Sequence, residues 1–335
     1  MKYQKLGNTD IDVSVIALGC WGIGGGNVWS DLSPEVRDVS ALLDGAEDLG
    51  INYIDTAPVY GVGRSESVLG QALKGRRDHF ILQTKVCLNW RNEGGEFEYE
   101  RDGKMVYKDH HAEAIRKDVE GSLERLQTDY IDSVVVHRMS QTVPVSETMG
   151  ELNRLKQEGK IRTVVISNSE PENLDEYSQY GEVSGVQEKF SILSVAKKNY
   201  FTTCSKHHAL FQVYGSLEEG ALTGKKFLER SFGNGDVRTA NHWNTEPYRS
   251  ALAKMYDALE PLTEKYHCSF ANLFQAWTLK QYDHLNLLTG FRHLSTMQDT
   301  CKVFDITLSD EDAVKMDQEA EKVRALGSAA KSFVK

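Results

Sequence analysis

The chain has 335 residues, of which 49 are acidic and 39 are basic, so it carries a formal net charge of −10 with histidine neutral. This acidic excess argues against a nucleic acid or an anionic membrane as a general partner, because both would repel the chain. No apolar run approaches the roughly 20 residues that a membrane span requires, and no apolar segment follows the N-terminal charges. We therefore expect a globular protein of the cytoplasm.

Neither the cysteines nor the histidines indicate a cross-linked or metal-binding protein. The five cysteines, an odd number, are scattered along the chain without a CxxC pair, which is typical of reduced thiols in the cytosol. The adjacent pairs His110-His111 and His207-His208 have no cysteine or carboxylate at ligand spacing. We expect no metal site.

Short apolar runs of strand character recur along the whole chain. They cover eight ranges: 13–18, 51–54, 80–82, 131–136, 161–166, 183–186, 210–213 and 285–288. Segments with helical spacing lie between them, and the first, from Val36 to Ala46, can be capped by Ser33 and ended by Gly50. Continuous apolar strands that alternate with helices are typical of a parallel sheet covered by helices. Eight of them predict an α/β fold of the (β/α)8 TIM barrel type.

A doubly wound sheet is the rival architecture. Its phosphate-binding GxGxxG turn would follow the first strand and enter a helix directly. The glycine-rich stretch 19–26 instead leads into 27–30, and the next helix begins only near Pro34. We therefore interpret these glycines as a loop at the mouth of a barrel.

Two segments are longer than a minimal barrel needs, and both follow a strand. They are 88–110, after the third strand, and 223–248, after the seventh. Long loops of this kind are commonly functional, and loops after strands lie on the C-terminal face, where barrel enzymes keep their sites. About 250 residues suffice for a barrel, so these loops and the terminal segments allow residues 1–335 to form a single domain.

Polar residues end six of the apolar runs. They are Asp55, Lys85, His137, the pair Ser167-Asn168, Gln187 and Tyr214, in the order of the second to the seventh strand. Taken singly, each can be a turn former or a helix cap. Because the carboxyl ends of all barrel strands meet on one face, the set predicts a site there.

The chemistry of such a site depends on a tyrosine beside the lysine. Tyr60 lies in the loop that follows Asp55. A buried Lys85 held by Asp55 keeps its charge, and that charge should lower the pKa of Tyr60 from about 10. A tyrosine acid with His137 near the reacting oxygen can protonate a carbonyl oxygen as hydride reaches its carbon. Hydride transfer requires a carrier, which implies a nicotinamide cofactor.

These residues resemble the aldo-keto reductase family over nearly the whole chain. The matching motifs are Asp55-x4-Tyr60-Gly with Glu66 and Gly70, Lys85 after Ile-Leu-Gln-Thr, Asp129-Tyr-Ile-Asp-x4-His137-Arg, Gly159-Lys-Ile-Arg-x4-Ser167-Asn168, Val186-Gln187, the run from Tyr214 to Lys225, and Gly290-x-Arg292. Within the family the chain is most similar to bacterial members of the inositol and sugar-aldehyde type, which share the long loop after the third strand.

The resemblance implies a barrel that binds NADPH in extended form, with a catalytic tetrad on Asp55, Tyr60, Lys85 and His137. Cofactor contacts fall on Trp21 and Gly22 in the first loop, on Ser167, Asn168 and Gln187 for the carboxamide, and on Tyr214 for stacking. The pyrophosphate and ribose positions are Leu217, Gly220, Leu222, Gly224 and Lys225, and the adenosine positions are Gly290, Arg292, Gln298 and Asp299.

Departures from the family pattern affect the cofactor and the substrate. Glu218 and Glu219 bring two carboxylates near the expected pyrophosphate, and Arg292 is the evident partner for a 2′-phosphate. NADP(H) is therefore favoured, and NAD(H) stays open. Substrate contacts are expected from the aromatic residues Trp29, Trp90 and Trp243, and Arg91 or Arg138 could pair with an anionic substituent.

We therefore expect an oxidoreductase that transfers a hydride between NADP(H) and a small carbonyl compound, a sugar aldehyde or a polyol-derived ketone. An NAD-dependent sugar or polyol dehydrogenase with the same site is one alternative. A cofactor-sensing barrel with very slow turnover, like channel-associated members of the family, is another. The sequence leaves the substrate, the physiological direction and the oligomeric state open.

Overall fold

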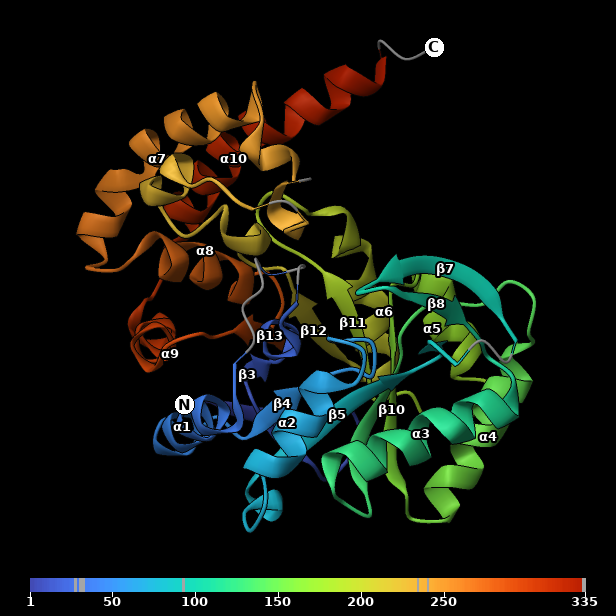
Figure 1. The fold of residues 1–335 in the computed structure, drawn as a ribbon. Coiled ribbons are helices and arrows are strands. Elements are labelled where there is room, and N and C mark those ends of the chain that lie inside the picture. Colours follow the sequence, from blue (N-terminus) through green and yellow to red (C-terminus); the bar gives the residue numbers. More distant parts are fainter. Residues whose placement is uncertain (27–28, 30–33, 92–93, 234, 240, 333–335) are drawn as a thin grey trace.

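Eight parallel strands form a closed barrel in the computed structural model, which describes residues 1–26, 29, 34–91, 94–233, 235–239 and 241–332 (Figure 1). The strands neighbour one another in the order β3-β4-β5-β9-β10-β11-β12-β13, and β13 pairs with β3. Their bounds are β3 Ile16–Gly19, β4 Tyr53–Asp55, β5 Ile81–Val86, β9 Ile131–Val136, β10 Ile161–Ser167, β11 Gly185–Lys189, β12 Leu210–Tyr214 and β13 Leu285–Gly290. The predicted (β/α)8 barrel is confirmed.

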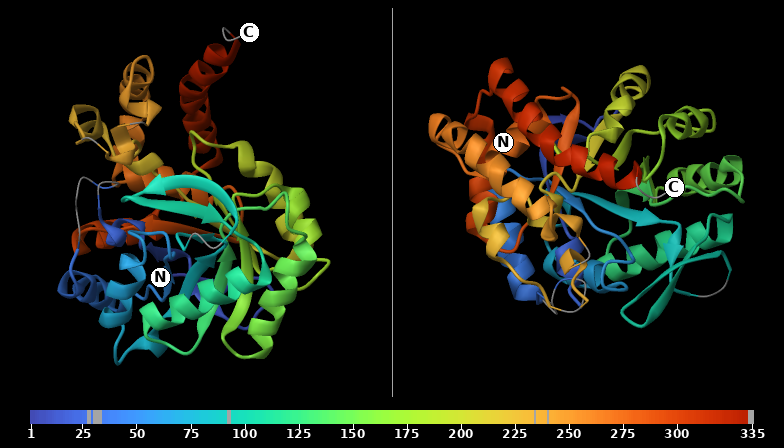
Figure 2. Two further views of the ribbon diagram at one scale, coloured as in Figure 1. Left: turned by 45° about the vertical axis from the view of Figure 1, so that its right-hand side comes forward. Right: turned by 90° about the horizontal axis from the view of Figure 1, so that it is seen from above.

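Helices surround the barrel, as the view from above shows (Figure 2). They are α1 Val36–Asp48, α2 Arg64–Ala72, α3 Ala112–Leu126, α4 Val145–Gln157, α5 Pro171–Tyr177, α6 Tyr200–His207, α7 Tyr248–Lys265, α8 Phe270–Leu279, α9 Leu294–Cys301 and α10 Asp310–Ser332. The far end of α10 projects away from the barrel (Figure 1). In the described part of the chain, none of these helices is long and apolar enough to cross a membrane.

The start of α1 differs from the sequence prediction. Ser33, the predicted cap, lies outside the described residues. Glu35 is the N-cap, and its side chain and that of Asp38 form a reciprocal capping box. The helix ends at Asp48, and Gly50 follows in the left-handed region with φ 73°.

The first apolar run also differs, because it contains two strands. Residues Asp12–Ser14 form β2, which pairs with β1 (Tyr3–Lys5) in an antiparallel hairpin, and only Ile16–Gly19 enters the barrel. The hairpin buries Leu6, Ile11 and Val13 against residues of the barrel interior. An apolar run can thus serve two strands, since both the hairpin and the barrel strand bury their side chains.

The segment after β5 is an antiparallel sheet and not an irregular loop. It contains β6 (Leu88–Asn89), β7 (Glu96–Arg101) and β8 (Lys104–Lys108), in the order β6-β8-β7. The β7–β8 ribbon lies outside the ring of barrel strands (Figure 1). The segment after β12 contains the short 3-10 turns η6 (Lys225–Glu229), η7 (Val237–Thr239) and η8 (His242–Asn244) before α7 begins. Both insertions therefore start at carboxyl ends of barrel strands, as predicted.

Glu66 joins three elements of the barrel wall from a fully buried position in α2. Its two carboxylate oxygens accept hydrogen bonds from Thr84 of β5 at 2.5 Å and from Arg125 Nε of α3 at 2.7 Å. The helices approach closely, because a Cβ on Gly70 would lie 2.4 Å from the carbonyl oxygen of Arg125. Glu66 therefore ties α2 to its neighbours beneath the loop that carries Tyr60.

Replacing Glu66 with glutamine should destabilise the fold by about 2–3 kcal/mol, because it removes the charge that Arg125 pairs with in a buried setting. Urea unfolding measures this loss. Glu113→Gln is the matched control: Glu113 is an exposed partner of Lys117 on α3, and its replacement should cost less than about 0.5 kcal/mol. Equal effects of the two substitutions would contradict the structural role of Glu66.

Candidate active site

A buried ion pair lies at the carboxyl ends of β4 and β5. Asp55 is 4% exposed and Lys85 is 1% exposed. The Lys85 Nζ lies 2.7 and 2.8 Å from the two carboxylate oxygens of Asp55 and 2.8 Å from the carbonyl oxygen of Thr56. These three acceptors match the three hydrogens of an ammonium group, so Lys85 is held in one orientation.

Amide side chains inside the barrel complete the surroundings of Asp55. Gln83 and Gln187 donate to Asp55 Oδ1 at 2.7 and 2.9 Å. Both also donate to Gln212 Oε1, and Tyr53 donates to Gln83 Oε1 at 2.5 Å. Gln187 uses both amide hydrogens in this network, so only its amide oxygen could meet a ligand. Sequence reasoning missed Gln83 and Gln212, although a glutamine inside an apolar strand run is itself a signal for a polar interior.

Tyr60 lies above the ion pair. Its ring centre is 5.0 Å from Lys85 Nζ, 6.2 Å from the His137 ring and 6.3 Å from the Trp21 ring. The four residues of the predicted tetrad are therefore close together at one end of the barrel. They come from four parts of the chain, namely β4, the loop after it, β5 and the residue after β9.

Two glycines allow the Tyr60 loop to approach the first loop. A Cβ on Gly24 would lie 2.6 Å from the carbonyl carbon of Tyr60, and one on Gly61 would lie 2.1 Å from the carbonyl oxygen of Gly24. Gly61 also has a φ of 61°, which side chains disfavour. Contact between these backbones positions Tyr60 beside Trp21.

The predicted direction of the Tyr60 pKa shift is wrong for this arrangement. Burial raises the pKa of Tyr60 well above 10, and the Asp55 carboxylate raises it further. Lys85, which is paired with Asp55 at 2.7 Å, does not reverse the shift. Burial, and second the charge of Lys85, lowers the pKa of His137 well below 6.5. At neutral pH the site therefore presents a protonated phenol and a neutral imidazole.

A second group of predicted residues lies next to His137. Asn168 donates to the His137 carbonyl oxygen at 2.9 Å and accepts from the Tyr214 hydroxyl at 2.8 Å. Ser167 donates to the carbonyl oxygen of Gln187 at 2.7 Å. These bonds link the ends of β10, β11 and β12, so the structure brings the predicted nicotinamide residues together.

The loop after β12 contains three glycines in the left-handed region. Gly215, Gly220 and Gly224 have φ values of 67°, 107° and 125°. A Cβ added to Gly220 or to Gly22 would meet nothing within 4 Å, so both glycines border open space. Leu222 is buried behind the loop, and Leu217 packs against the main core.

The two glutamates of this loop are turned to internal partners. Glu218 is fully buried, 2.8 Å from Lys189 Nζ, and accepts from the Trp243 indole N–H at 3.0 Å. Glu219 lies 3.3 Å from Lys189 and accepts from Asn241 at 2.9 Å. Lys189 therefore offsets the negative charges of both glutamates, although sequence reasoning did not single it out. Trp243 is only 4% exposed, so its predicted substrate contact is not supported.

The predicted cations for the cofactor differ in their surroundings. Lys225 lies 2.7 and 2.9 Å from Asp257 and Glu260 of α7, so its charge is already paired. Arg292, just beyond Gly290 of β13, is exposed and makes no ion pair with any residue that the structure describes. Its guanidinium carbon is 5.7 Å from the centre of the Trp29 ring.

The remaining predicted residues are spread around the mouth. Gln298 is exposed on α9, and Asp299 accepts from Ser269 at 2.8 Å. Trp29 packs edge-on against Trp21 with ring centres 4.9 Å apart, which places it at the site.

Three of the predicted substrate residues have protein partners. Arg91 Nη1 lies 2.7 Å from the buried Asp118, so it faces α3 and not a ligand. Arg138 lies 3.6 Å from Glu98 of the insertion. Trp90 packs on the apolar cluster between the Tyr60 loop and the insertion. An anion-binding role for Arg91 is therefore not supported.

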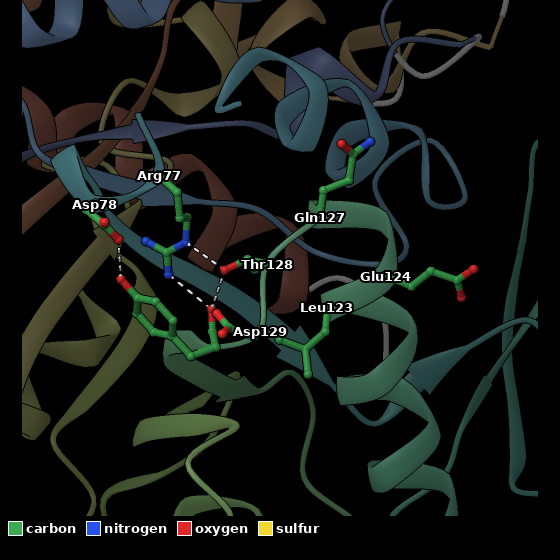
Figure 3. A pocket seen from close by; sticks show the side chains of 8 residues that line it. Arg77, Asp78, Leu123, Glu124, Gln127, Thr128 and Asp129 are labelled. Atoms are coloured by element: carbon green, nitrogen blue, oxygen red, sulfur yellow. Dashed lines mark hydrogen bonds between the residues drawn. The ribbon is translucent and has the colours of Figure 1, made fainter. Parts of the chain in front are cut away.

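A separate surface hollow lies at the opposite, amino-terminal ends of β5 and β9 (Figure 3). Arg77 donates there to Thr128 at 3.2 Å and to the Tyr130 carbonyl oxygen at 3.1 Å, and Tyr130 donates to Asp78 at 3.1 Å. Arg77 and the Tyr130 hydroxyl are thus engaged with other residues that line the hollow.

Comparisons with known proteins agree with this geometry. Residues 15–321 match the model of the Aldo/keto reductase family. The chain is 38% identical to an NADH-specific methylglyoxal reductase of Escherichia coli, over 96% of this chain and 99% of the relative. It is 33% identical to the aldo-keto reductase YhdN of Bacillus subtilis, over 93% and 91%. A glycerol dehydrogenase from Gluconobacter oxydans has a similar structure, with a TM-score of 0.85, 30% identity and coverage of 96% and 95%.

The raised pKa of Tyr60 can be measured without substrate. Phenolate absorbance is titrated in the wild type and in Tyr60→Phe, and the difference between the two curves reports Tyr60 alone. Because the raised pKa keeps the phenol protonated, the two curves should coincide below about pH 10. A one-tyrosine step in the wild type below about pH 9 would show that Lys85 dominates after all.

Proposed function

The chain belongs to the aldo/keto reductase family, and from that premise we propose that it reduces a small carbonyl compound with a nicotinamide cofactor, with Tyr60 as the acid. Family membership confirms the resemblance seen in the sequence and carries the oxidoreduction of carbonyls with it. The observation that supports the residue roles is the buried Lys85–Asp55 pair beneath Tyr60 and His137.

Each residue of this group has a role that follows from its state. Tyr60 is protonated at neutral pH and donates its proton to the carbonyl oxygen. His137 is neutral, so it can donate a hydrogen bond to that oxygen without competing for the proton. Lys85, oriented by Asp55, stabilises the negative charge that forms on Tyr60 after the transfer. In the oxidative direction Tyr60 acts as the base.

The residues present fit a nicotinamide cofactor. Buried polar groups normally have hydrogen-bond partners, yet His137 Nδ1 has none among the described residues. A bound ligand could supply that missing partner. Asn168 and Tyr214 would hold the nicotinamide, and the glycine loop from 215 to 224 would hold the pyrophosphate. When bound, the reduced cofactor supplies the hydride.

The choice between the two nicotinamide cofactors depends on Arg292. Partial burial lowers the pKa of Arg292, and the charges of Arg238 and Arg230 lower it further, while Asp236, the ion-pair partner of Arg238, opposes them. Three arginines beside one carboxylate leave an excess of positive charge that favours an anion, and the 2′-phosphate of NADP(H) is such a group. We therefore propose NADP(H). NAD(H) is the second candidate, favoured by the NADH-specific relative from Escherichia coli.

For the substrate we propose a sugar aldehyde or a polyol-derived ketone. The named activities of two relatives support small oxygen-rich compounds, since one is a methylglyoxal reductase and the other a glycerol dehydrogenase. Trp21 and Trp29 form an aromatic wall beside Tyr60, and such walls suit stacking against a sugar face.

Tyr60→Phe should lower kcat for aldehyde reduction by about 10²–10⁴-fold, because it removes the proton donor. Cofactor affinity, followed by fluorescence, should stay within about twofold, since the substitution alters none of the proposed cofactor contacts. Full turnover in the variant would contradict the mechanism. Undetectable turnover in the wild type, with cofactor still bound, would favour the cofactor-sensing alternative.

Arg292→Ala tests the cofactor choice. If Arg292 binds the 2′-phosphate, the variant should lose about 10–100-fold in affinity for NADPH, because a charge-assisted contact is removed. Its affinity for NADH should change by less than about twofold. Lys225→Ala is the matched control, because Lys225 is paired with α7 and should discriminate little between the cofactors. Equal losses for NADPH and NADH in Arg292→Ala would contradict the assignment.

A further inference from the structure

The β7–β8 hairpin brings an arginine to the substrate side of the candidate site. Arg101 ends β7 and pairs across the turn Asp102-Gly103 with Lys104 of β8. The tip of this hairpin touches the first loop of the barrel, because a Cβ on Gly26 would lie 2.9 Å from Asp102 Oδ1. The insertion after β5 thus reaches the loop that carries Trp21.

Two aromatic rings position the guanidinium of Arg101. Its central carbon is 4.9 Å from the centre of the Tyr99 ring and 6.0 Å from the centre of the Trp21 ring. The Trp21 ring is itself 6.3 Å from the ring of Tyr60. Arg101 and the proposed proton donor are therefore both neighbours of the Trp21 ring.

The charge of Arg101 acts on the reacting residues. It lowers the pKa of both Tyr60 and His137, although burial is the largest influence on each. The guanidinium is thus close enough to influence any ligand that touches them.

Arg101 differs in its partners from three other arginines near the mouth. Arg91 faces Asp118, Arg138 faces Glu98, and Arg238 faces Asp236, each within ion-pair distance. The guanidinium of Arg101 has neither an ion pair nor a hydrogen bond to any described residue, and it contacts the two rings. Stacking on a ring leaves the N–H groups at the edge of the guanidinium available for oxygen acceptors.

We infer that Arg101 selects carbonyl substrates that carry an anionic oxygen group, a carboxylate or a phosphate. The inference rests on the proposed function, because it assumes that the carbonyl is reduced beside Tyr60. A planar guanidinium binds either group through two parallel hydrogen bonds. In a chain with a net charge of −10, a small anion needs such a local cation to enter the mouth.

Matched pairs of aldehydes test the selection. One pair is glyceraldehyde 3-phosphate and glyceraldehyde, and the other is 4-carboxybenzaldehyde and its methyl ester. The wild type should prefer the charged member of at least one pair. Arg101→Gln should lower kcat/KM for that member by about 10–100-fold, mainly through KM, and for the neutral member by less than about threefold. A loss confined to one pair identifies phosphate or carboxylate as the group.

Two further variants separate a direct contact from other effects. Lys104→Gln removes the same charge from an exposed position on the same hairpin, and it should change the preference by less than about twofold. Arg101→Lys should retain only part of the preference, because it keeps the positive charge and loses the two parallel N–H donors of the guanidinium. Equal losses in Lys104→Gln and Arg101→Gln would show long-range attraction and overturn the assignment.

The remaining outcomes distinguish this inference from the proposed function. Equal losses on neutral and charged aldehydes in Arg101→Gln would show that the residue merely holds the hairpin, and they would overturn the inference alone. So would a wild type that reduces both members of each pair equally well. A wild type that reduces no aldehyde with either nicotinamide cofactor would overturn the proposed function as well.

Discussion

The buried Lys85–Asp55 pair is the constraint on which the rest of the site depends. Removing two charges from water costs several kcal/mol for each ion, and only good geometry with further hydrogen bonds offsets that cost. This explains why the barrel interior is polar beneath the pair, where Gln83, Gln187 and Gln212 bond to Asp55 or to one another. Above the pair, burial keeps Tyr60 protonated, and the carboxylate of Asp55 adds to that effect.

Rigid and adjustable parts of the site come from different elements. The ends of the barrel strands hold the ion pair, the Asn168 contacts and the nicotinamide side in a fixed hydrogen-bonded frame. The insertions after β5 and β12 bring residues to the mouth without entering that frame. The Arg101 side chain of one insertion contacts the Trp21 ring, and Trp243 of the other bonds to Glu218, which also pairs with Lys189. Barrel enzymes commonly keep one frame while their loops vary, and the proposed role of Arg101 follows that pattern.

Much of the fold could be predicted from the sequence, because apolar runs and helical spacing are local signals. The polar residues at the strand ends could be predicted as a group for the same reason, since a parallel barrel leaves no other place for them. The contacts of single side chains could not. Trp243 and Arg91 look like ligand residues in the sequence. In the structure, however, Trp243 donates a hydrogen bond to Glu218, and Arg91 forms an ion pair with Asp118.

The sequence by itself determined the barrel, the family and the set of residues at the strand ends, because these follow from periodicity and from motifs that each span a few residues. Only the tertiary structure decided the charge states and the neighbours within the site. The pKa of Tyr60 depends on burial and on the Asp55 carboxylate, and the position of Arg101 depends on a hairpin folding back onto the first loop. The pKa and the position both depend on groups that come together only when the chain is folded.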